Sequence, residues 1–502
     1  MKEKLLIENN LKNQWIVIYD KYEGLSKKAI NLINATMKDL YPDHLSFYSE
    51  NEVNEEFLKD KNFILLTKND SKLLKDISSK KQFDYNYKEQ GFTVEVSSNV
   101  YNEELQSVII AGNDDYGLVY GVVDFINIYC GSLIFKTKRA INFIDVRYYH
   151  MPFADPIPDW HHKSNPSASE RGIWTWGHCI YNYKKFLDNM VLLKLNELVV
   201  WNDYAPINAK DVVEYAHSLG IKVIWGFAWG WDTNCHESGN LDDNGLLALK
   251  ENIIKRCLNE FNTADGIYFQ SFTETTASDI NGRNIAETVV GLVNDVCKVL
   301  LEKNPEMIIQ FGLHSQSVKN HLHFIKNVDK RVHIIWENCG TFPFDGDKFS
   351  KLPEIDLGDY EETKRYTKEI AVLRGKDDKF GVVLKAMLGL DWHTFTHQKP
   401  NWIMGEHTEK FIKERSKTQS RIWNSMQPIW LRYAQNAIDI VKGMVDLKEK
   451  INIQGLVEDG IFEDKIFFPV ALYANIIWDC NKSSTDLISE VMKYPCVELA
   501  NV

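Results

Sequence analysis

The segment ELVVWNDYAPINAKDVVEYAHSLGIKVIWGFAWGW, residues 197–231, carries the pattern that decides the fold. Its two ends, 197–203 and 222–231, contain near-continuous apolar runs of the length of a strand. Between them, residues 209–220 place apolar side chains at helical spacing and finish on Gly220, a residue typical of a helix end. Strands that are apolar on both faces and joined by a helix predict a parallel sheet covered on both sides.

The same unit recurs along the middle of the chain. Seven strand-like runs, each followed by a helical stretch, lie at residues 172–176, 197–203, 222–231, 266–274, 307–315, 332–340 and 381–392. The alternatives are an open doubly wound sheet and a closed barrel. No glycine-rich phosphate turn follows the first run, and a length of about 230–250 residues suits a barrel. We expect an α/β fold with a (β/α)8 TIM barrel whose eighth strand is NWIMGE, residues 401–406, or is degenerate.

The chain on either side of this repeat has a different rhythm. Before it, helical stretches alternate with strand-like runs at 15–20, 62–67, 93–98 and 107–114. Residues 151–170 contain four prolines and predict a linker or a crossing loop. We therefore expect three parts: an α+β domain at 1–150, the barrel at 151–405 and a helical C-terminal region at 406–502.

The composition limits the partners and the compartment. The net charge is −12 and there is no basic cluster, which argues against nucleic acid and anionic membranes as partners. No run approaches the ~20 apolar residues of a membrane span, and the N-terminus lacks the apolar region of a secretory signal. The eight cysteines form no C-x-x-C pair, so we expect reduced thiols and a cytoplasmic location. A homo-oligomer stays an open alternative.

Acidic and aromatic residues gather where the strand-like runs end. In a (β/α)8 barrel these ends meet at one mouth, where active sites lie. Glu274 closes the fourth run, Glu337 lies in the sixth and Asp391 in the seventh. The tryptophans in or just after the runs are Trp174, Trp176, Trp201, Trp225, Trp229, Trp231, Trp336 and Trp392. Sugar C–H faces stack on indoles, and glycoside hydrolysis needs a carboxylic acid and a carboxylate, so the pattern suits carbohydrate chemistry.

We predict Glu274 as the general acid, Glu337 as its carboxylate partner and Asp391 as a reserve. Candidate substrate-binding residues at the same strand ends are Trp201, Asn202, Trp229, His314, Trp336, Trp392 and His393. Structural alternatives exist: Glu274 as a first-turn helix charge, Glu337 in an ion pair, and the histidines bound to backbone carbonyls. The carboxyl groups of an inverting pair stand ~6.5–9.5 Å apart, and those of a retaining pair ~5–5.5 Å. We see no ligand spacing for a metal and expect no cofactor.

Several segments resemble two groups of glycoside hydrolase. TVEVSS followed by SVIIAGNDDYGLVYGVVDFI resembles the small α+β domain that precedes the barrel in family 20 hexosaminidases and family 67 α-glucuronidases. ERGIWTW is similar to the first barrel strand of the hexosaminidases, whose arginine holds sugar hydroxyls; this implies Arg171 as a substrate-binding residue. ELVVWND, SFTE and IIWE resemble the second-strand, acid-glutamate and base-glutamate segments of the α-glucuronidases.

The resemblance, which extends over about residues 90–340, implies an O-glycosyl hydrolase acting on oligosaccharides or glycosides, α-glucuronidase-like and inverting. Thr273 stands where substrate-assisted hexosaminidases carry an aspartate before the acid. A β-N-acetylhexosaminidase-like hydrolase and a non-catalytic carbohydrate-binding protein stay open as alternatives. In each case the expected partner is a carbohydrate.

Overall fold

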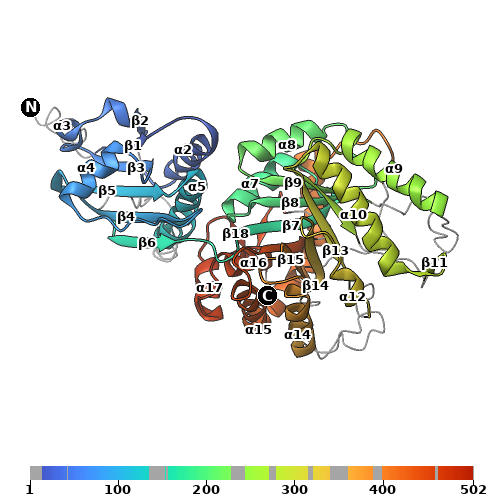
Figure 1. Cartoon of the computed structure of the whole chain (residues 1–502). Helices are drawn as coiled ribbons and strands as arrows, with labels where there is room; N and C mark the ends of the chain where they lie inside the picture. The colour runs from blue at the N-terminus through green and yellow to red at the C-terminus, as the bar shows by residue number, and fades with distance from the viewer. Residues whose placement is uncertain are drawn as a thin grey trace, which may run out of the picture. The chain divides into compact units, whose positions relative to one another are not determined.

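The computed structural model describes residues 14–41, 43–134, 153, 156–227, 243–270, 279–314, 320–339, 360–387, 398–457 and 462–500. The chain divides into two compact units (Figure 1). Unit 1 comprises Met1–Pro166, Ser218–Gly220 and Ser489–Val497. Unit 2 comprises Ser167–His217, Ile221–Ile488 and Glu498–Val502.

Unit 1 contains a six-stranded mixed sheet. Its strands, in spatial order, are β2 (Ser46–Ser49), β1 (Trp15–Tyr19), β3 (Asn62–Lys68), β5 (Asn102–Gly112), β4 (Phe92–Asn99) and β6 (Trp160–Ser164). The first four are parallel, and β4 runs antiparallel to both β5 and β6. The accompanying helices are α2 (Gly24–Met37), α3 (Glu55–Leu58), α4 (Lys72–Lys80) and α5 (Asp115–Asp124), which continues as a π-helix over Phe125–Cys130. The four strands predicted from sequence are β1, β3, β4 and β5.

The sequence interpretation of unit 1 needs two corrections. Part of the predicted loop 151–170 is strand β6, so the unit extends to Pro166 rather than to residue 150. In addition, the helix Asp115–Ile134 is long and apolar enough to cross a membrane, although no such run was expected, and most of it is buried. It packs closely on the sheet at Gly121. A Cβ at this position would come within 2.8 Å of Ile110, so only glycine allows the helix so close. We read it as the core helix of this unit.

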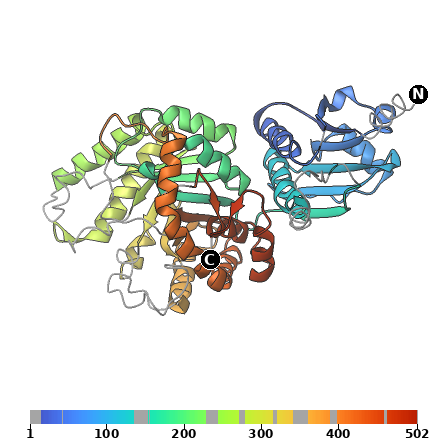
Figure 2. The same ribbon diagram turned by 180° about the vertical axis from the view of Figure 1, so that it is seen from behind.

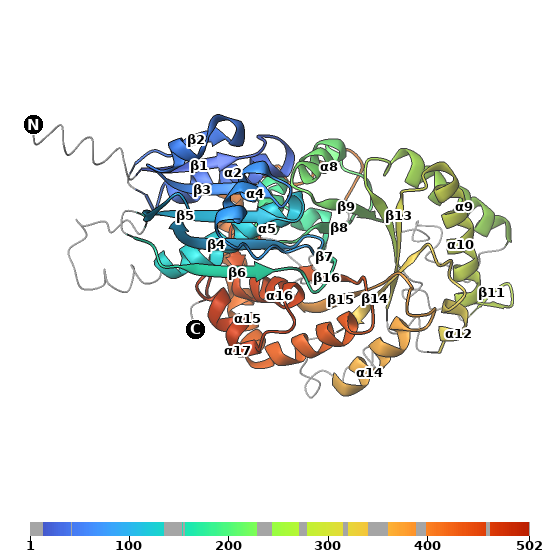
Figure 3. The same ribbon diagram turned by 60° about the vertical axis from the view of Figure 1, so that its left-hand side comes forward.

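Unit 2 is a closed barrel of eight parallel strands (Figure 3). In chain order they are β7 (Glu170–Trp176), β8 (Glu197–Trp201), β9 (Lys222–Gly226), β10 (Gly266–Gln270), β13 (Ile308–Leu313), β14 (His333–Cys339), β15 (Phe380–Met387) and β16 (Asn452–Val457). The ring closes where β16 pairs with β7, with Asn452 opposite Glu170 and Leu456 opposite Trp174. The predicted (β/α)8 barrel is confirmed.

The eighth strand is β16, so the prediction of residues 401–406 was wrong. Helix α15 (Glu409–Val445) lies between the seventh and eighth strands in the chain, and α16 (Phe468–Trp478) follows the eighth. Figure 2 shows α15, in orange, on the outside of unit 2. The barrel therefore continues past residue 405, and 406–502 is not a separate helical region. Residues 401–406 belong to a loop that touches Asn182 through an isolated bridge at Glu406.

The helices of unit 2 follow the strands and lie outside them (Figure 1). Besides α15 and α16 they are α7 (Tyr183–Leu192), α8 (Ala209–Ser218), α9 (Asp243–Asn259), α10 (Ile285–Lys303), α12 (Leu322–Ile325), α14 (Tyr360–Ala371) and α17 (Ser484–Val491). The short strands are β11 (Asp279–Ile280), β12 (Arg283–Asn284), β17 (Ile466–Phe467) and β18 (Val497–Glu498). Asn182, Asn284 and Thr408 begin α7, α10 and α15 by accepting a backbone N–H, which is the usual way to satisfy a helix start.

Candidate active site

The carboxyl ends of the barrel strands bring Glu337 together with two polar side chains. Glu337 lies near the end of β14 and is 4% exposed. Tyr268 of β10 donates its hydroxyl to Glu337 Oε1 at 2.5 Å, and Nζ of Lys385 on β15 lies 3.8 Å from Oε2. Each carboxylate oxygen thus has its own partner, a phenol on one side and an ammonium on the other. These contacts orient the carboxylate.

Gly312 of β13 makes room for this arrangement. In the barrel, β13 lies between β10 and β14, which carry the phenol and the carboxylate. A Cβ at position 312 would overlap both Tyr268 Oη and Glu337 Oε1. A glycine in a strand often marks such a close approach, and here it permits the hydrogen bond across the intervening strand.

Burial and neighbouring charges set the protonation of two groups at this end of the barrel. Burial, followed by the charge of Glu337, raises the pKa of Tyr268 well above its usual value, so the phenol keeps its proton and acts as the donor. Burial, followed by the positive charge of Lys385, lowers the pKa of His314 to about 3. His314, which directly follows β13, is therefore a neutral imidazole that can both donate and accept.

Aromatic side chains fill the barrel beside Tyr268. The ring of Trp174 is stacked with that of Trp201, at a centroid distance of 6.2 Å, and meets Tyr268 edge-on at 5.9 Å. Trp176 meets Trp174 edge-on at 4.9 Å. The three indoles are buried within one cluster, so Trp201 is mainly part of the apolar lining. This lining lowers the polarity around Tyr268 and strengthens its interaction with Glu337.

Asn202 lies at the end of β8, against the first residue after β7. Its backbone N–H donates to the carbonyl of Gly226 at 2.9 Å, and the whole residue is buried. A Cβ at Gly177 would overlap Asn202 Oδ1. In the part of the chain that the structure describes, no donor reaches this oxygen. A buried acceptor of this kind is suited to a hydroxyl donor.

Arg171 lies at the opposite end of the barrel, so the prediction that it binds substrate was wrong. It is the second residue of β7 and is fully buried. Its guanidinium donates to the carbonyls of Lys194, Ala168 and Ser169 at 2.9, 2.7 and 3.1 Å. It also lies 5.0 Å from the ring centre of Trp478 on α16. Arg171 therefore joins backbone segments at the amino ends of the strands.

Trp336 faces away from the barrel interior, which corrects its prediction as a substrate-binding residue. Neighbouring side chains of a strand point to opposite faces, and Ile335 and Glu337 take the inner one. The Trp336 indole donates to Thr367 Oγ1 at 3.0 Å and meets the ring of Tyr366 edge-on at 5.5 Å. Both partners belong to α14, so Trp336 holds that helix on the barrel.

Five predicted site residues lie outside the described residues. They are Glu274, Asp391, Trp229, Trp392 and His393. Their roles stay predictions. Of the predicted residues that are described, Glu337, His314, Trp201 and Asn202 lie at the carboxyl ends of strands.

Sequence reasoning missed Tyr268 and Lys385. A signal existed for the lysine, since it interrupts the apolar run GVVLKAM at residues 381–387. The tyrosine gave no such signal, because aromatic residues are common in buried strands. Only the closure of the barrel shows that these two residues flank Glu337.

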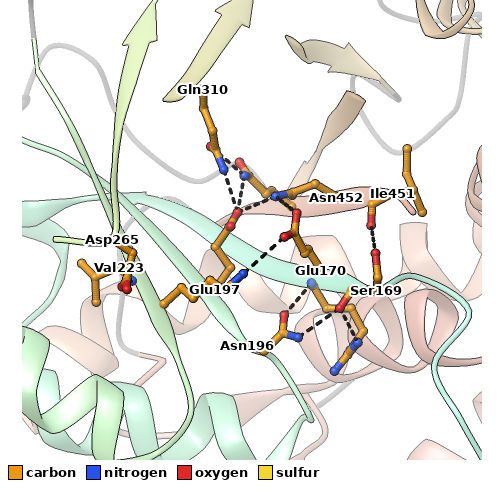
Figure 4. A network of polar contacts seen from close by, with 12 residues as sticks. Ser169, Glu170, Asn196, Glu197, Val223, Asp265, Gln310, Ile451 and Asn452 are labelled. Carbon is orange, nitrogen blue, oxygen red and sulfur yellow. Dashed lines mark hydrogen bonds and ion pairs between the residues drawn. The ribbon is translucent and has the colours of Figure 1, made fainter. Parts of the chain in front are cut away.

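A second buried glutamate lies at the amino end of the barrel (Figure 4). Glu197, the first residue of β8, accepts three side-chain amides at Oε1: Gln310 at 3.1 Å, Asn452 at 2.7 Å and Gln454 at 2.8 Å. Burial, followed by the charge of Glu170, raises the pKa of Glu197 to about 7. This end of a (β/α)8 barrel generally serves stability rather than chemistry.

The described ranges contain no group of three or more His, Cys, Asp or Glu side chains that could hold a metal ion. Six cysteines whose side chains the structure describes are free thiols, and five of them are buried. The groups described around Glu337 are a phenol, an ammonium and, near Lys385, an imidazole.

Comparison with known proteins gives structural similarity only. No protein-family model and no curated protein sequence matches the chain. A GH138 enzyme targeting pectin rhamnogalacturonan II aligns at a TM-score of 0.49 with 10% identity, over 94% of this chain and 52% of that one. A family 89 enzyme from Clostridium perfringens, in complex with its substrate GlcNAc-α-1,4-galactose, aligns at 0.45 with 10% identity, over 93% and 50%.

The chain thus spans about half the length of these two enzymes. Similarity at this level says nothing about the reaction. The functional case rests on the residues of the barrel itself.

Proposed function

We propose that this chain is an O-glycosyl hydrolase with Glu337 as a catalytic carboxylate. The observation that carries the proposal is the position of Glu337: a buried carboxylate at the carboxyl end of a barrel strand, held by Tyr268 on one oxygen and facing Lys385 on the other. Active sites of (β/α)8 enzymes lie at this end, and glycoside hydrolysis is a reaction of carboxyl groups.

In the proposed inverting reaction, Glu337 is the general base. It accepts a proton from the water that attacks the anomeric carbon, while the bond from that carbon to the leaving oxygen breaks. Glu274 gives a proton to the leaving oxygen, with Asp391 as the reserve acid. Tyr268 and Lys385 orient Glu337 for this step.

His314 and Asn202 are the proposed partners of sugar hydroxyls. The neutral imidazole can accept from a hydroxyl or donate to one, and Asn202 Oδ1 can accept. The aromatic lining around Tyr268 would lower the polarity around the carboxylate and so strengthen its interactions in the transition state.

We further propose an α-glucuronidase-like reaction on oligosaccharides or glycosides in the cytoplasm. The support is the resemblance of ELVVWND, SFTE and IIWE, in that order along the chain. The anomeric form of the first product, followed by NMR, tests the inverting course directly. Retention would make Glu337 a nucleophile instead.

A panel of aryl glycosides tests the hydrolase proposal. It should include α-glucuronide, β-N-acetylglucosaminide, β-glucoside and β-galactoside. A natural disaccharide should accompany each hit, because an aryl group that departs readily needs no proton from the general acid. We expect one activity that is lost in Glu337→Gln and, on the disaccharide, in Glu274→Gln. Glu197→Gln is the matched control, since it makes the same change at the other end of the same barrel.

Two results would contradict the proposal. A hit on the β-N-acetylglucosaminide that survives Glu337→Gln would favour a hexosaminidase-like reaction with other carboxyl groups. Sugar binding without cleavage, equal in wild type and Glu337→Gln, would leave a carbohydrate-binding protein.

A further inference from the structure

Apolar side chains are exposed beside the mouth of the barrel. Ile207 is 65% exposed, Ile403 49% and Tyr204 41%, while Trp402 is half-buried. Tyr204 and Ile207 belong to the loop after β8, and Trp402 and Ile403 to the loop before α15. We call these four residues the rim patch. Single exposed apolar residues are common, but a group contributed by two loops calls for an explanation.

Hydrogen bonds join the two loops into one surface. The Trp402 indole donates to the carbonyl of Tyr204 at 2.9 Å, and the Ile207 N–H donates to the carbonyl of Trp402 at 3.0 Å. The side chain of Asn208 donates to the Met404 carbonyl and accepts its N–H, at 2.9 and 3.0 Å. These backbone groups bind one another, so they are not offered to a ligand.

Two further contacts hold the loop after β8. Asp203 accepts the backbone N–H of Gln398 at 2.9 Å, and its carbonyl accepts Arg256 Nη2 at 2.6 Å. The Arg256 guanidinium also lies 5.6 Å from the ring centre of Tyr204. The patch is therefore supported before any ligand arrives, which lowers the entropy lost on binding.

The rim patch is continuous with the mouth. A Cβ at Gly177 would come within 2.7 Å of the indole carbon Cη2 of Trp402, so the indole reaches the end of β7 and lies beside Asn202. In the barrel, β8 is four strands from β14 in either direction. The patch therefore extends from the side of the mouth opposite Glu337.

This opposition matches the geometry of glycoside hydrolysis. The attacking water and the leaving group lie on opposite faces of the sugar ring. With Glu337 as the base, the water is on the β14 side and the leaving group points toward β8. The leaving oxygen carries the rest of the substrate, the aglycone, toward the rim patch.

We propose that the rim patch binds an apolar aglycone, and that the substrates are glycosides whose leaving group carries an aromatic or polycyclic body. The inference rests on the proposed function and adds the substrate class. Ile207 and Ile403 offer apolar area without hydrogen-bonding groups. The indole N–H of Trp402 is already donated to the carbonyl of Tyr204, whereas a second sugar needs donors and acceptors around its ring. A cleaved glycoside yields the free sugar and the protonated aglycone, with water as the other reactant.

The test compares phenyl and naphthyl glycosides of the sugar that the panel identifies, with substituents chosen so that both leaving groups have the same acidity. Wild type should prefer the naphthyl glycoside by roughly tenfold in kcat/KM, because the second ring buries more apolar area. In Ile207→Ser/Ile403→Ser the ratio should fall toward one. Leu247→Ser is the control, since Leu247 is 50% exposed on α9 and lies outside the patch; it should keep the wild-type ratio.

Two outcomes overturn the inference. The double variant keeps the wild-type ratio, or a disaccharide of the same sugar is cleaved with a higher kcat/KM than the naphthyl glycoside. If the ratio is kept and the double variant also turns a dimer into a monomer on a sizing column, the patch is an interface between copies. If an activity depends on Glu337 and shows no naphthyl preference, only this inference fails; if no glycoside is cleaved, the proposed function fails as well.

Discussion

The barrel buries two glutamates at its opposite ends and surrounds them differently. Glu337 at the mouth accepts a hydrogen bond from a phenol and lies 3.8 Å from an ammonium. Glu197 at the amino end meets three neutral amides, and burial raises its pKa to about 7. The neighbours of Glu337 thus orient a carboxylate at the mouth, whereas at Glu197 burial and the charge of Glu170 outweigh the amide hydrogen bonds and favour the protonated form.

The largest expected effect is on catalysis at the mouth. Glu337→Gln keeps the size of the side chain and removes its basicity, so we expect kcat to fall about a thousandfold. Steady-state rates on the substrate identified by the panel measure this. Glu197→Gln should keep a kcat close to that of wild type. Equal losses in the two variants would mean that the ends of the barrel are not functionally different.

The second prediction concerns stability and pH. The pKa of folded Glu197, about 7, exceeds its ordinary value of 4.5, so the folded chain binds this proton more tightly. That stabilisation is fully present below pH 4.5 and is lost as the pH rises through about 7. Glu197→Gln should therefore gain free energy of unfolding relative to wild type, on the order of 3 kcal/mol, between acidic and mildly alkaline pH.

Urea unfolding at several pH values, followed by tryptophan fluorescence, checks this prediction. The control is Glu287→Gln, an exposed glutamate in the first turn of α10, which should follow the wild-type pH dependence. Parallel curves for wild type and Glu197→Gln would show that Glu197 does not titrate in this range.

The third prediction separates orientation from packing at the mouth. Tyr268→Phe keeps the ring and removes the donor to Glu337, so kcat should fall about 10- to 100-fold. KM should change much less, because the phenol contacts the carboxylate. Tyr473→Phe removes another buried phenol, one that donates to the carbonyl of Gly172, and should leave kcat close to that of wild type. An unchanged kcat in Tyr268→Phe would sink the positioning role.

The smallest expected effect is at Trp336. Trp336→Phe loses the hydrogen bond to Thr367 on the outer face of β14, so the free energy of unfolding should fall by about 1 kcal/mol. The KM should not change, because the indole does not face the mouth. A tenfold higher KM would restore the original interpretation of Trp336 as a sugar-binding residue.

The sequence was most informative where strands are buried on both faces. Seven barrel strands are apolar runs followed by helices. Parallel strands that are apolar on both faces must be covered on both faces, and the helices between them provide this cover. The eighth strand, NIQGLV, escaped because Asn452 and Gln454 interrupt it. Those two residues are polar because they bind Glu197, so the hidden strand and the network at the amino end have one cause.

The candidate site was predictable only in part. A carboxylate at the end of a strand points to the mouth, and this placed Glu337. The resemblance to the hexosaminidases misplaced Arg171, and Trp336 was misplaced because the sequence does not tell which face of the strand its side chain takes. Tyr268 and Lys385 needed the register of three neighbouring strands.

The closure of the barrel by β16 has a consequence for how the chain acquires its fold. The hydrogen bond from Thr175 to Val457 joins residues 282 positions apart. During synthesis, the first strand therefore emerges long before its partner and waits with an unpaired edge, which is a state that invites pairing with other chains. A chain ending at residue 405 would stay in that state for good, with open edges on both β7 and β15.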